Sequence, residues 1–463
     1  MLMDFMVIPT PHAIKSQISR RSLLQDLVTA TSLSTALARS VSAEANDIHA
    51  IAEEAYIWGL PLWLQEKYLE RSRQDNTPLN RFTLSSELAR PEDRNVGPNV
   101  DTLYGYAWLD LEAEPVVLFV PDTNDRYYCI QFIDAYSNSF DYVGRRVTGT
   151  KEGRYAIAGP GWNGHVPDGI VRLNAPTNRV LALARTLVRG EADLPNARAI
   201  QEKITLTPLS SLKNPPQLSL SVVSAIGVFP FLHPGEQGAR YLDDLGRYLQ
   251  ADPPPRRENA PLERFASAKI GPGFTPSNSA QHAQYADAVA AADDRVKAAN
   301  YSSRVNGWKV NYGVTPFITD RLQRAAANRL GPGTHVAEEA LYFVATADSK
   351  GNPLTGESRY RIQFAPGQFP PVDAFWSLIL YGADFFLYKN SLNRYSISDR
   401  TEGLLHQPDG SLEISLQHPN PGPSASNWLP APDGNFQLVL RTYQPKPEVL
   451  RREWKPPLIE AIS

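Results

Sequence analysis

The sequence predicts a mainly β protein with a helical middle, in which two β-sandwiches flank a small helical domain. Short aromatic and β-branched runs, separated by Gly, Pro and Asn turns, dominate up to about Val188 and return after Gly331. Between them, apolar residues recur with helical spacing. The composition agrees, because 39 Pro with 20 Tyr, 17 Phe and 8 Trp suit sandwiches joined by ordered loops. At 463 residues, the chain has room for roughly three domains.

The N-terminal segment 1–43 is predicted to be a twin-arginine signal peptide. Ser19–Leu24 resembles the twin-arginine export motif, Leu27–Leu37 supplies an apolar region, and Val41–Ala43 ends as a peptidase site should. The mature protein is then periplasmic or secreted. Because Asp26 interrupts the apolar region, an amphipathic N-terminal helix of a cytoplasmic protein is the alternative. After this segment no run is long and apolar enough to cross a bilayer.

The predicted first domain, 44–193, joins a helix to a β-sandwich. Asp47–Glu66 has mixed helical spacing and is expected to kink or break near Pro61. Asn99–Tyr104 is expected to be an ordered polar loop, since Pro98 disfavours helix before it. The expected strands are Val116–Val120, Tyr127–Asp134, Tyr155–Ala158, Ile170–Leu173 and Val180–Leu187.

The predicted second and third domains are 194–330 and 331–463. The helical period of the second predicts helices at Asn196–Ile204, Gln237–Leu249, Pro261–Lys269, Ser279–Asn300 and Thr319–Asn328. In the third, Ser411–Gln417 alternates strictly between apolar and polar residues, which indicates a half-buried antiparallel strand. Further strands are expected at Arg359–Phe364, Phe375–Tyr381 and Phe436–Tyr443.

Charge, cysteine and histidine usage restrict the function. A formal net charge of −3 gives no basic footprint for nucleic acid. Cys129 is the single cysteine, so no intrachain disulfide forms, and its place in an apolar strand indicates a small buried residue. The eight histidines show no close metal-ligand spacing, and no phosphate or dinucleotide motif occurs. No metal and no cofactor is predicted.

A first candidate cluster surrounds Asp101 and Asp134. Two carboxylates in differently desolvated positions can act as general acid and base, which makes both candidate catalytic residues. The side chains expected to bind or orient a substrate beside them are Asn99, Tyr104, Arg145 and Arg146. The alternative is structural: Asp101 caps a turn, and Arg145 or Arg146 pairs with it.

A second candidate cluster lies in the C-terminal sandwich. It comprises Trp376, Tyr381, Arg394, Tyr395, Asn427, Trp428 and Arg441. Aromatic rings beside Arg and Asn suit sugars, aromatic metabolites or another subunit, because the rings stack while the polar groups fix orientation. The alternative is a set of core aromatics with an interdomain ion pair.

From about Asp47 to the C-terminus, the chain resembles two-domain bacterial and fungal proteins with domain of unknown function 1254 followed by domain of unknown function 1214. The resemblance rests on Pro98–Tyr104, Tyr127–Asp134, Phe375–Ser377, Asn393–Ser396, Asp409–Ser411 and Asn427–Pro430. It implies an immunoglobulin-like N-terminal sandwich, a small helical domain and a C-terminal jelly-roll sandwich. The family has no established reaction, and its members are often exported.

Three functions follow as hypotheses. The first is an exported, cofactor-independent hydrolase or lyase that acts on a small polar or glycan-like substrate between the two sandwiches. The second is a non-catalytic envelope protein that binds a ligand or a partner there, and the third is a tailoring enzyme for a secondary metabolite. An enzyme needs Asp101 or Asp134 in a cleft, whereas a binder needs an accessible groove with the aromatic platform. A homo-oligomer is left open.

Overall fold

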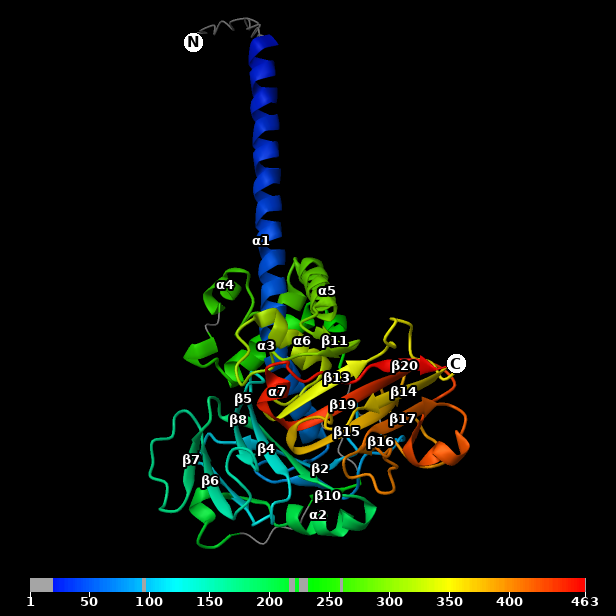
Figure 1. Cartoon of the computed structure of the whole chain (residues 1–463). Coiled ribbons are helices and arrows are strands. Elements are labelled where there is room, and N and C mark those ends of the chain that lie inside the picture. The colour runs from blue at the N-terminus through cyan, green and yellow to red at the C-terminus, as the bar shows by residue number, and fades with distance from the viewer. Residues whose placement is uncertain (1–19, 94–96, 216–220, 225–231, 259–260, 463) are drawn as a thin grey trace, which may run out of the picture.

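Two β-sandwiches lie side by side under a layer of helices (Figure 1). The computed structural model describes residues 20–93, 97–215, 221–224, 232–258 and 261–462, with the side chains of 20–46, 330 and 423–424 excepted. The predicted fold class, mainly β with a helical middle, is confirmed.

The N-terminal sandwich consists of two sheets. One has the strand order β10-β1-β2-β8-β4-β5, and the other has the order β7-β6-β3-β9. The bounds are β1 Thr83–Ser85, β2 Thr102–Asp110, β3 Val116–Val120, β4 Tyr128–Asp134, β5 Ser139–Gly144, β6 Gly153–Ala158, β7 Val171–Asn174, β8 Arg179–Leu187, β9 Thr205–Pro208 and β10 Ser221–Val223. The expected loop Asn99–Tyr104 is therefore shorter than predicted, because Thr102 to Tyr104 already pair with β8.

The C-terminal sandwich is also built from two sheets. Their strand orders are β11-β12-β13-β19-β15-β16 and β18-β17-β14-β20. The bounds are β11 Ser303–Val305, β12 Trp308–Val310, β13 Ala340–Ala345, β14 Arg359–Phe364, β15 Val372–Gly382, β16 Ser396–Ser398, β17 Leu412–Gln417, β18 Trp428–Pro430, β19 Phe436–Pro445 and β20 Ile459–Ile462. The predicted alternating strand is β17, whose Leu412, Ile414 and Leu416 are buried.

The helices are α1 Arg20–Gln74, α2 Leu194–Gln201, α3 Arg240–Ala251, α4 Leu262–Ser267, α5 His282–Ala298, α6 Arg321–Leu330 and α7 Pro447–Leu450. Of the kink or break expected near Pro61, the break is wrong, because α1 continues through this residue, and the helix starts far before Asp47. A proline removes one helical hydrogen bond, but Trp58 and Trp63 on either side are buried in the helical core. None of the described helices combines the length and apolarity needed to span a membrane.

The helical layer is not confined to the segment 194–330. Trp58 and Leu62 of α1 share one core with α3, α5 and α6. Conversely, β9 and β10 pair with the N-terminal sheets, and β11 and β12 extend a C-terminal sheet. The predicted boundaries near residues 194 and 330 therefore mark where the helical sequence pattern starts and stops. The sheets of both sandwiches nevertheless include strands from within the segment 194–330.

A buried carboxyl pair joins the helical layer to β8 and gives a pH-dependent stability. Burial and the neighbouring Asp252 raise the pKa of Glu66 to about 7, against the opposing charge of Arg179. A carboxyl with a raised pKa stabilises the fold fully below its unfolded pKa, near 4.5, and this contribution disappears as pH rises through 7. We expect the free energy of unfolding to fall by roughly 3 kcal/mol across that window.

The check is denaturant unfolding of the wild type and Glu66→Gln between pH 4.5 and 8. The amide does not ionise, so the variant should lose most of this dependence. Glu70→Gln, which changes a partly exposed carboxyl on the same helix, serves as the control. An unchanged slope in Glu66→Gln would assign the dependence to other groups.

Candidate ligand-binding site

A cavity of about 480 Å³ lies where the two sandwiches face each other. The N-terminal sheet contributes β2 and β8, and the C-terminal sheet contributes β12, β13 and β19. Its charged and aromatic lining residues are Glu87, Tyr104, Arg185, Lys309, Tyr342, Phe385 and Arg441. Aliphatic side chains between them include Leu183, Val314, Val344 and Val439. Such a concave, mostly apolar space with a few polar groups is typical of small-molecule sites.

The alternation of β8 decides which of its side chains reach this cavity. Ala182 and Ala184 point into the core of the N-terminal sandwich, whereas Leu183 and Arg185 line the cavity on the other face. On the same face Leu181 packs against the helical layer. The outer face of this sheet is thus covered by helices at one end and by the other sandwich at the opposite end.

Each facing sheet presents an arginine beside a tyrosine on the neighbouring strand. Arg185 of β8 is paired in register with Tyr104 of β2, and its guanidinium carbon lies 5.1 Å from that ring's centroid. Arg441 of β19 is paired with Tyr342 of β13, at 5.6 Å. Cation–π contacts of this kind hold the guanidinium groups over the tyrosine faces.

The Arg185 side chain is held by neutral acceptors. Its Nη1 donates to Gln131 Oε1 at 3.0 Å, its Nη2 to the Gly333 carbonyl at 2.8 Å, and its Nε to Tyr104 Oη at 3.2 Å. The side chain is only 5 % exposed. None of the described residues supplies it with a carboxylate.

Arg441 is held in the same manner from the other sandwich. Its Nη2 donates to Tyr381 Oη at 2.7 Å and to the Gly97 carbonyl at 2.9 Å, while its buried Nε has no acceptor among the described residues. It is 7 % exposed and, within the described part of the chain, meets no carboxylate. A buried positive charge without a counter-ion is unfavourable, so this arrangement favours an anion in the cavity.

Burial and the positive charges of the arginines affect the pKa values of neighbouring side chains. Burial, then the charges of Arg185, Arg146 and Arg441, hold the pKa of His335 well below its usual value, so its imidazole is neutral. Burial raises the pKa of Tyr342 to about 12 although Arg185 and Arg441 oppose it, so the phenol stays protonated. The buried Oγ1 of Thr102, another lining residue, has no hydrogen-bond partner among the described residues.

The rim of the cavity carries partly exposed charged side chains. Lys309 makes no ion pair with any described residue. Glu87 is already paired with Arg90, whose Nη2 lies 2.6 Å from its Oε2. The rim therefore adds positive rather than negative charge to the two buried arginines.

Two predicted substrate-binding residues, Asn99 and Tyr104, do line this cavity. Asn99 Nδ2 donates to Tyr443 Oη at 2.8 Å, and Asn99 Oδ1 accepts from the Asp101 backbone at 2.6 Å. Both polar ends of Asn99 are therefore engaged within the protein. Tyr104 presents its ring and its hydroxyl beside Arg185.

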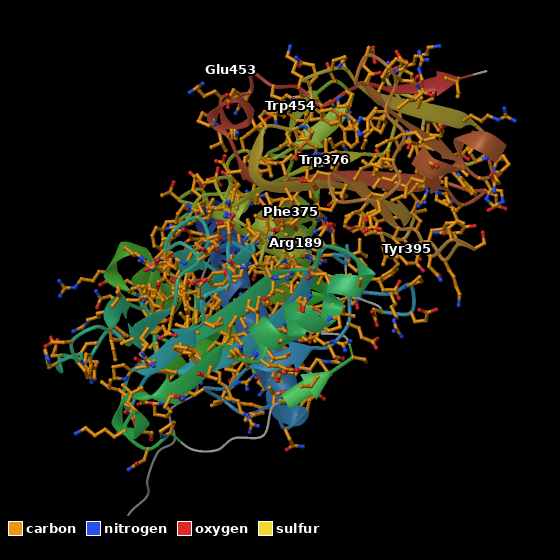
Figure 2. All side chains as sticks on the ribbon, turned by 60° about the horizontal axis from the view of Figure 1, so that its bottom comes forward. Arg189, Phe375, Trp376, Tyr395, Glu453 and Trp454 are labelled. Carbon is orange, nitrogen blue, oxygen red and sulfur yellow. The ribbon has the colours of Figure 1, made fainter. Side chains whose placement is uncertain are left out.

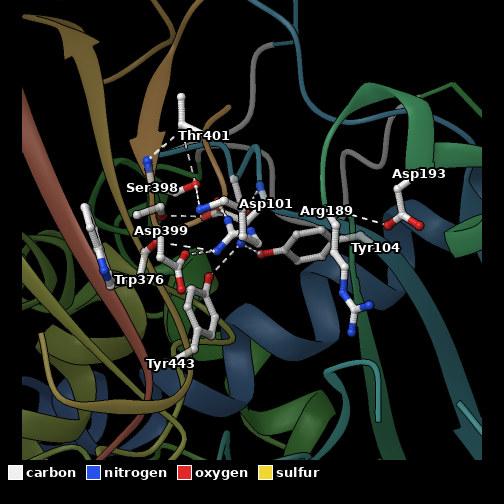
Figure 3. A network of polar contacts seen from close by, with 12 residues as sticks. Asp101, Tyr104, Arg189, Asp193, Trp376, Ser398, Asp399, Thr401 and Tyr443 are labelled. Carbon is white, nitrogen blue, oxygen red and sulfur yellow. Dashed lines mark hydrogen bonds and ion pairs between the residues drawn. The ribbon is translucent and has the colours of Figure 1, made fainter. Parts of the chain in front are cut away.

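Asp101, a predicted catalytic residue, connects the two sandwiches (Figure 3). Its Oδ1 lies 2.7 Å from Arg400 Nη2, and its Oδ2 accepts from Ser377 Oγ at 2.6 Å. It is 2 % exposed and is not among the cavity-lining residues. Asp101 therefore forms a structural ion pair, as the alternative expected, but its partner is Arg400 rather than Arg145 or Arg146.

Asp134, the second predicted catalytic residue, is buried among hydrogen-bond donors. Its Oδ1 accepts from the backbone of Tyr136 and of Asn138, both at 2.9 Å, and Arg257 Nη2 lies 2.7 Å from Oδ2. Burial raises the pKa of this carboxyl despite the opposing hydrogen bonds from Asn138 and the charge of Arg257.

The structure does not bring the two carboxylates together. Thr102, next to Asp101, pairs with Leu187 at one end of β8, whereas Asp134 pairs with Val180 near the other end. Seven residues of strand at ~3.3 Å each place them roughly 23 Å apart. The prediction that Asp101 and Asp134 act as acid and base on one bond does not fit this separation.

Arg145 and Arg146 hold the sandwiches together rather than lining the cavity. Arg145 Nη1 donates to Gln444 Oε1 at 2.8 Å and to the Asp373 carbonyl at 3.0 Å. Arg146 Nε donates to the buried Glu339 at 2.5 Å. Both contacts cross from the N-terminal to the C-terminal sandwich.

The second candidate cluster is dispersed. Figure 2 shows Phe375 at the boundary between the sandwiches and Trp376 inside the C-terminal one, where it packs on Phe364. Arg394 Nη1 donates to the carbonyls of Ala425, Ser426 and Trp428.

Other members of that cluster have structural partners as well. Asn427 bonds the backbone of Leu405 and Glu413, and Trp428 is buried with its Nε1 donating to Gln417. Only Tyr381 and Arg441 relate to the cavity, Tyr381 by supporting Arg441 and by donating to the Pro98 carbonyl at 2.7 Å. The buried Trp376 and Trp428 fit the core alternative, whereas Arg394 and Asn427 are half-buried and bond backbone carbonyls.

Arg185, Tyr342 and Lys309 were missed by the sequence predictions. The sequence does mark the two arginines as unusual, because Arg185 and Arg441 each interrupt an apolar strand and each is followed by Thr. A charged residue inside a strand that is buried on both faces needs a special environment. Nothing local indicated that the two strands would face each other.

Cys129 is buried, as predicted, and lies 3.7 Å from His335 Nε2. Burial and the nearby Glu339 raise the pKa of its thiol to about 12, so it is not a thiolate near neutral pH. Among the described residues no group of three or more His, Cys, Asp or Glu side chains is arranged to hold a metal ion.

The fold and the cavity define a two-sandwich protein with a cavity between its sandwiches. Its residues 79–208 match the family described as protein of unknown function DUF1254, and residues 339–447 match protein of unknown function DUF1214. The chain belongs to this two-domain family, as its sequence motifs predicted. The arginines Arg185 and Arg441 fall one in each family domain.

A solved structure shows the same fold. The VPA0106 protein from Vibrio parahaemolyticus is 24% identical, with a TM-score of 0.67 over 90% of this chain and 100% of its own. An uncharacterized protein from Burkholderia cenocepacia is 12% identical, with a TM-score of 0.43 over 92% of this chain and 98% of its own. No curated protein matches the chain.

Proposed function

We propose that this protein binds a small anionic molecule, with carboxylate or phosphate chemistry, in the cavity between its two sandwiches. The observation that carries the proposal is the pair Arg185 and Arg441. Both are buried, both line one cavity, and neither meets a carboxylate among the described residues. An anion would neutralise charges that the protein itself leaves uncompensated.

The site is prepared for such a ligand. Neutral acceptors and tyrosine rings fix both guanidinium groups before a ligand arrives, so little side-chain entropy is lost on binding. Arginine also offers paired N–H groups that match carboxylate and phosphate oxygens. Lys309 at the rim adds charge that attracts an anion toward the opening.

This function corresponds to the binding alternative more closely than to the hydrolase or lyase. The carboxylates Asp101 and Asp134 have structural partners and lie outside the cavity lining. Catalysis would therefore need another acid or base. Chemical change of a bound ligand, measured by mass spectrometry after incubation, is the observation that would favour an enzyme.

The test is thermal unfolding and calorimetry of the full chain with small carboxylates, phosphate and matched neutral amides. We expect anions, but not amides, to stabilise the wild type. Removing one charged hydrogen-bonding group should weaken affinity roughly 10- to 100-fold, so Arg185→Gln and Arg441→Gln should each show this loss.

The control is Arg361→Gln, because Arg361 pairs with Glu460 on the outer C-terminal sheet, away from the cavity. It should bind as the wild type does. Equal binding of carboxylates and amides, or unchanged affinity in both cavity variants, would refute the proposal.

The site of action that fits this proposal is the periplasm or the cell exterior. It rests on the twin-arginine motif at Ser19–Leu24, part of which lies outside the described residues. Fractionation of cells that express the protein with and without an Arg20→Lys, Arg21→Lys change tests it, since both changes should retain the protein in the cytoplasm. Homo-oligomer formation is open to measurement by light scattering.

A further inference from the structure

The two cavity arginines have separate supports. Arg185 is fixed by Gln131 and by the Gly333 carbonyl, whereas Arg441 is fixed by Tyr381 and by the Gly97 carbonyl. These supports come from different parts of the two sandwiches. The two guanidinium groups carry like charges and repel each other in a low-dielectric space. In the empty cavity each therefore stays at its own support.

The charge of the cavity requires more than one negative group. Arg185, Arg441 and Lys309 contribute three positive charges, and the single lining carboxylate in the described residues, Glu87, is already paired with Arg90. Neutralising only the two buried arginines takes two negative charges. A monoanion would leave one buried guanidinium without a counter-charge.

Apolar side chains line the cavity beside each arginine. Leu183 stands two residues from Arg185 on the same strand face, and Val439 stands two residues from Arg441. Tyr104 and Tyr342 add ring surface beside them. The body of an occupant therefore meets hydrocarbon and aromatic carbon, while its charged ends meet the guanidinium groups.

We infer that the ligand is a dicarboxylate with an apolar or aromatic body, one carboxylate for Arg185 and the other for Arg441. This inference rests on the proposed anion-binding function and specifies its ligand class. Each carboxylate accepts from the guanidinium group of the cavity-lining arginine that it meets.

The experiment is calorimetry on the full chain with a length series of α,ω-dicarboxylates, together with terephthalate. Each is compared with the monocarboxylate and the diamide of the same body, and with inorganic phosphate. At the best length, the dicarboxylate should bind at least tenfold more tightly than its monocarboxylate. Arg185→Gln and Arg441→Gln should each reduce the dicarboxylate to the affinity of the monocarboxylate, and the double variant should bind neither.

The possible results distinguish the inference of a dicarboxylate ligand from the proposed anion-binding function. Monocarboxylates or phosphate that bind as tightly as every dicarboxylate would overturn the two-carboxylate ligand and leave anion binding standing. Failure of all anions to bind would overturn both. Circular dichroism of the variants, with Arg361→Gln as the control, verifies that any loss comes from the site rather than from the fold.

Discussion

Replacing Asp101 by Asn is expected to lower the free energy of unfolding by about 3 kcal/mol. The carboxylate is buried and neutralises Arg400, whose guanidinium also stacks 4.3 Å from the Phe375 ring centroid at the boundary between the sandwiches. An amide at this position still accepts a hydrogen bond but carries no charge, so the half-buried Arg400 keeps only Asp399, 2.6 Å from its Nη1, as a counter-ion. Denaturant unfolding measures the change.

A double-mutant cycle with Arg400→Gln isolates the pair. If the ion pair is the cause, the double variant should be less destabilised than the sum of the two single variants. Asp122→Asn breaks the exposed contact with Lys151 and should change stability little. A fully stable Asp101→Asn protein that binds a ligand but no longer converts it would instead support a catalytic Asp101.

Asp134→Ala is expected to destabilise the protein by about 3 to 5 kcal/mol. The change leaves the backbone N–H groups of Tyr136 and Asn138 without their acceptor, and it leaves Arg257 without its carboxylate. Because the turn after β4 depends on these bonds, its local structure should loosen as well. Chemical denaturation and hydrogen exchange of the two amides measure both effects.

Asp134→Asn separates the two contributions. It keeps a carbonyl oxygen for the backbone amides and removes the charge, so it should lose less stability than Asp134→Ala. Asp110→Ala, which removes a carboxylate that accepts one backbone amide at 3.1 Å in a partly exposed turn, is the matched control. Equal stability of Asp134→Ala and the wild type would contradict this account.

Local sequence pattern predicted much of the fold. The strict alternation of Ser411–Gln417 identified β17, because a strand with one buried face alternates apolar and polar residues. The apolar run Val180–Leu187 identified β8, because a strand buried on both faces is apolar throughout. The continuity of α1 through Pro61 was not predicted. Packing of Trp58 and Trp63 against the helical layer outweighs the lost hydrogen bond, and that packing is invisible locally.

The candidate site was predicted only in part. Asn99 and Tyr104 were identified from a polar stretch beside a strand, and both line the cavity. The same stretch suggested Asp101, whose neighbour Asn99 faces the cavity while Asp101 itself turns to Ser377 and Arg400. Asn99 and Asp101 stand two positions apart, which would place them on one face of a regular strand, but both precede β2. Density of polar residues alone therefore does not tell which of them reach a ligand.

By itself, the sequence determined the family, the two-sandwich class and the place along the chain of nine of the twenty described strands, because each depends on local periodicity and short motifs. Only the tertiary structure decided that Arg185 and Arg441 share one cavity. Each arginine sits in an apolar strand for which sequence gives no partner. Stacking of the two sheets, fixed by packing across the whole interface, places both buried charges in the same space.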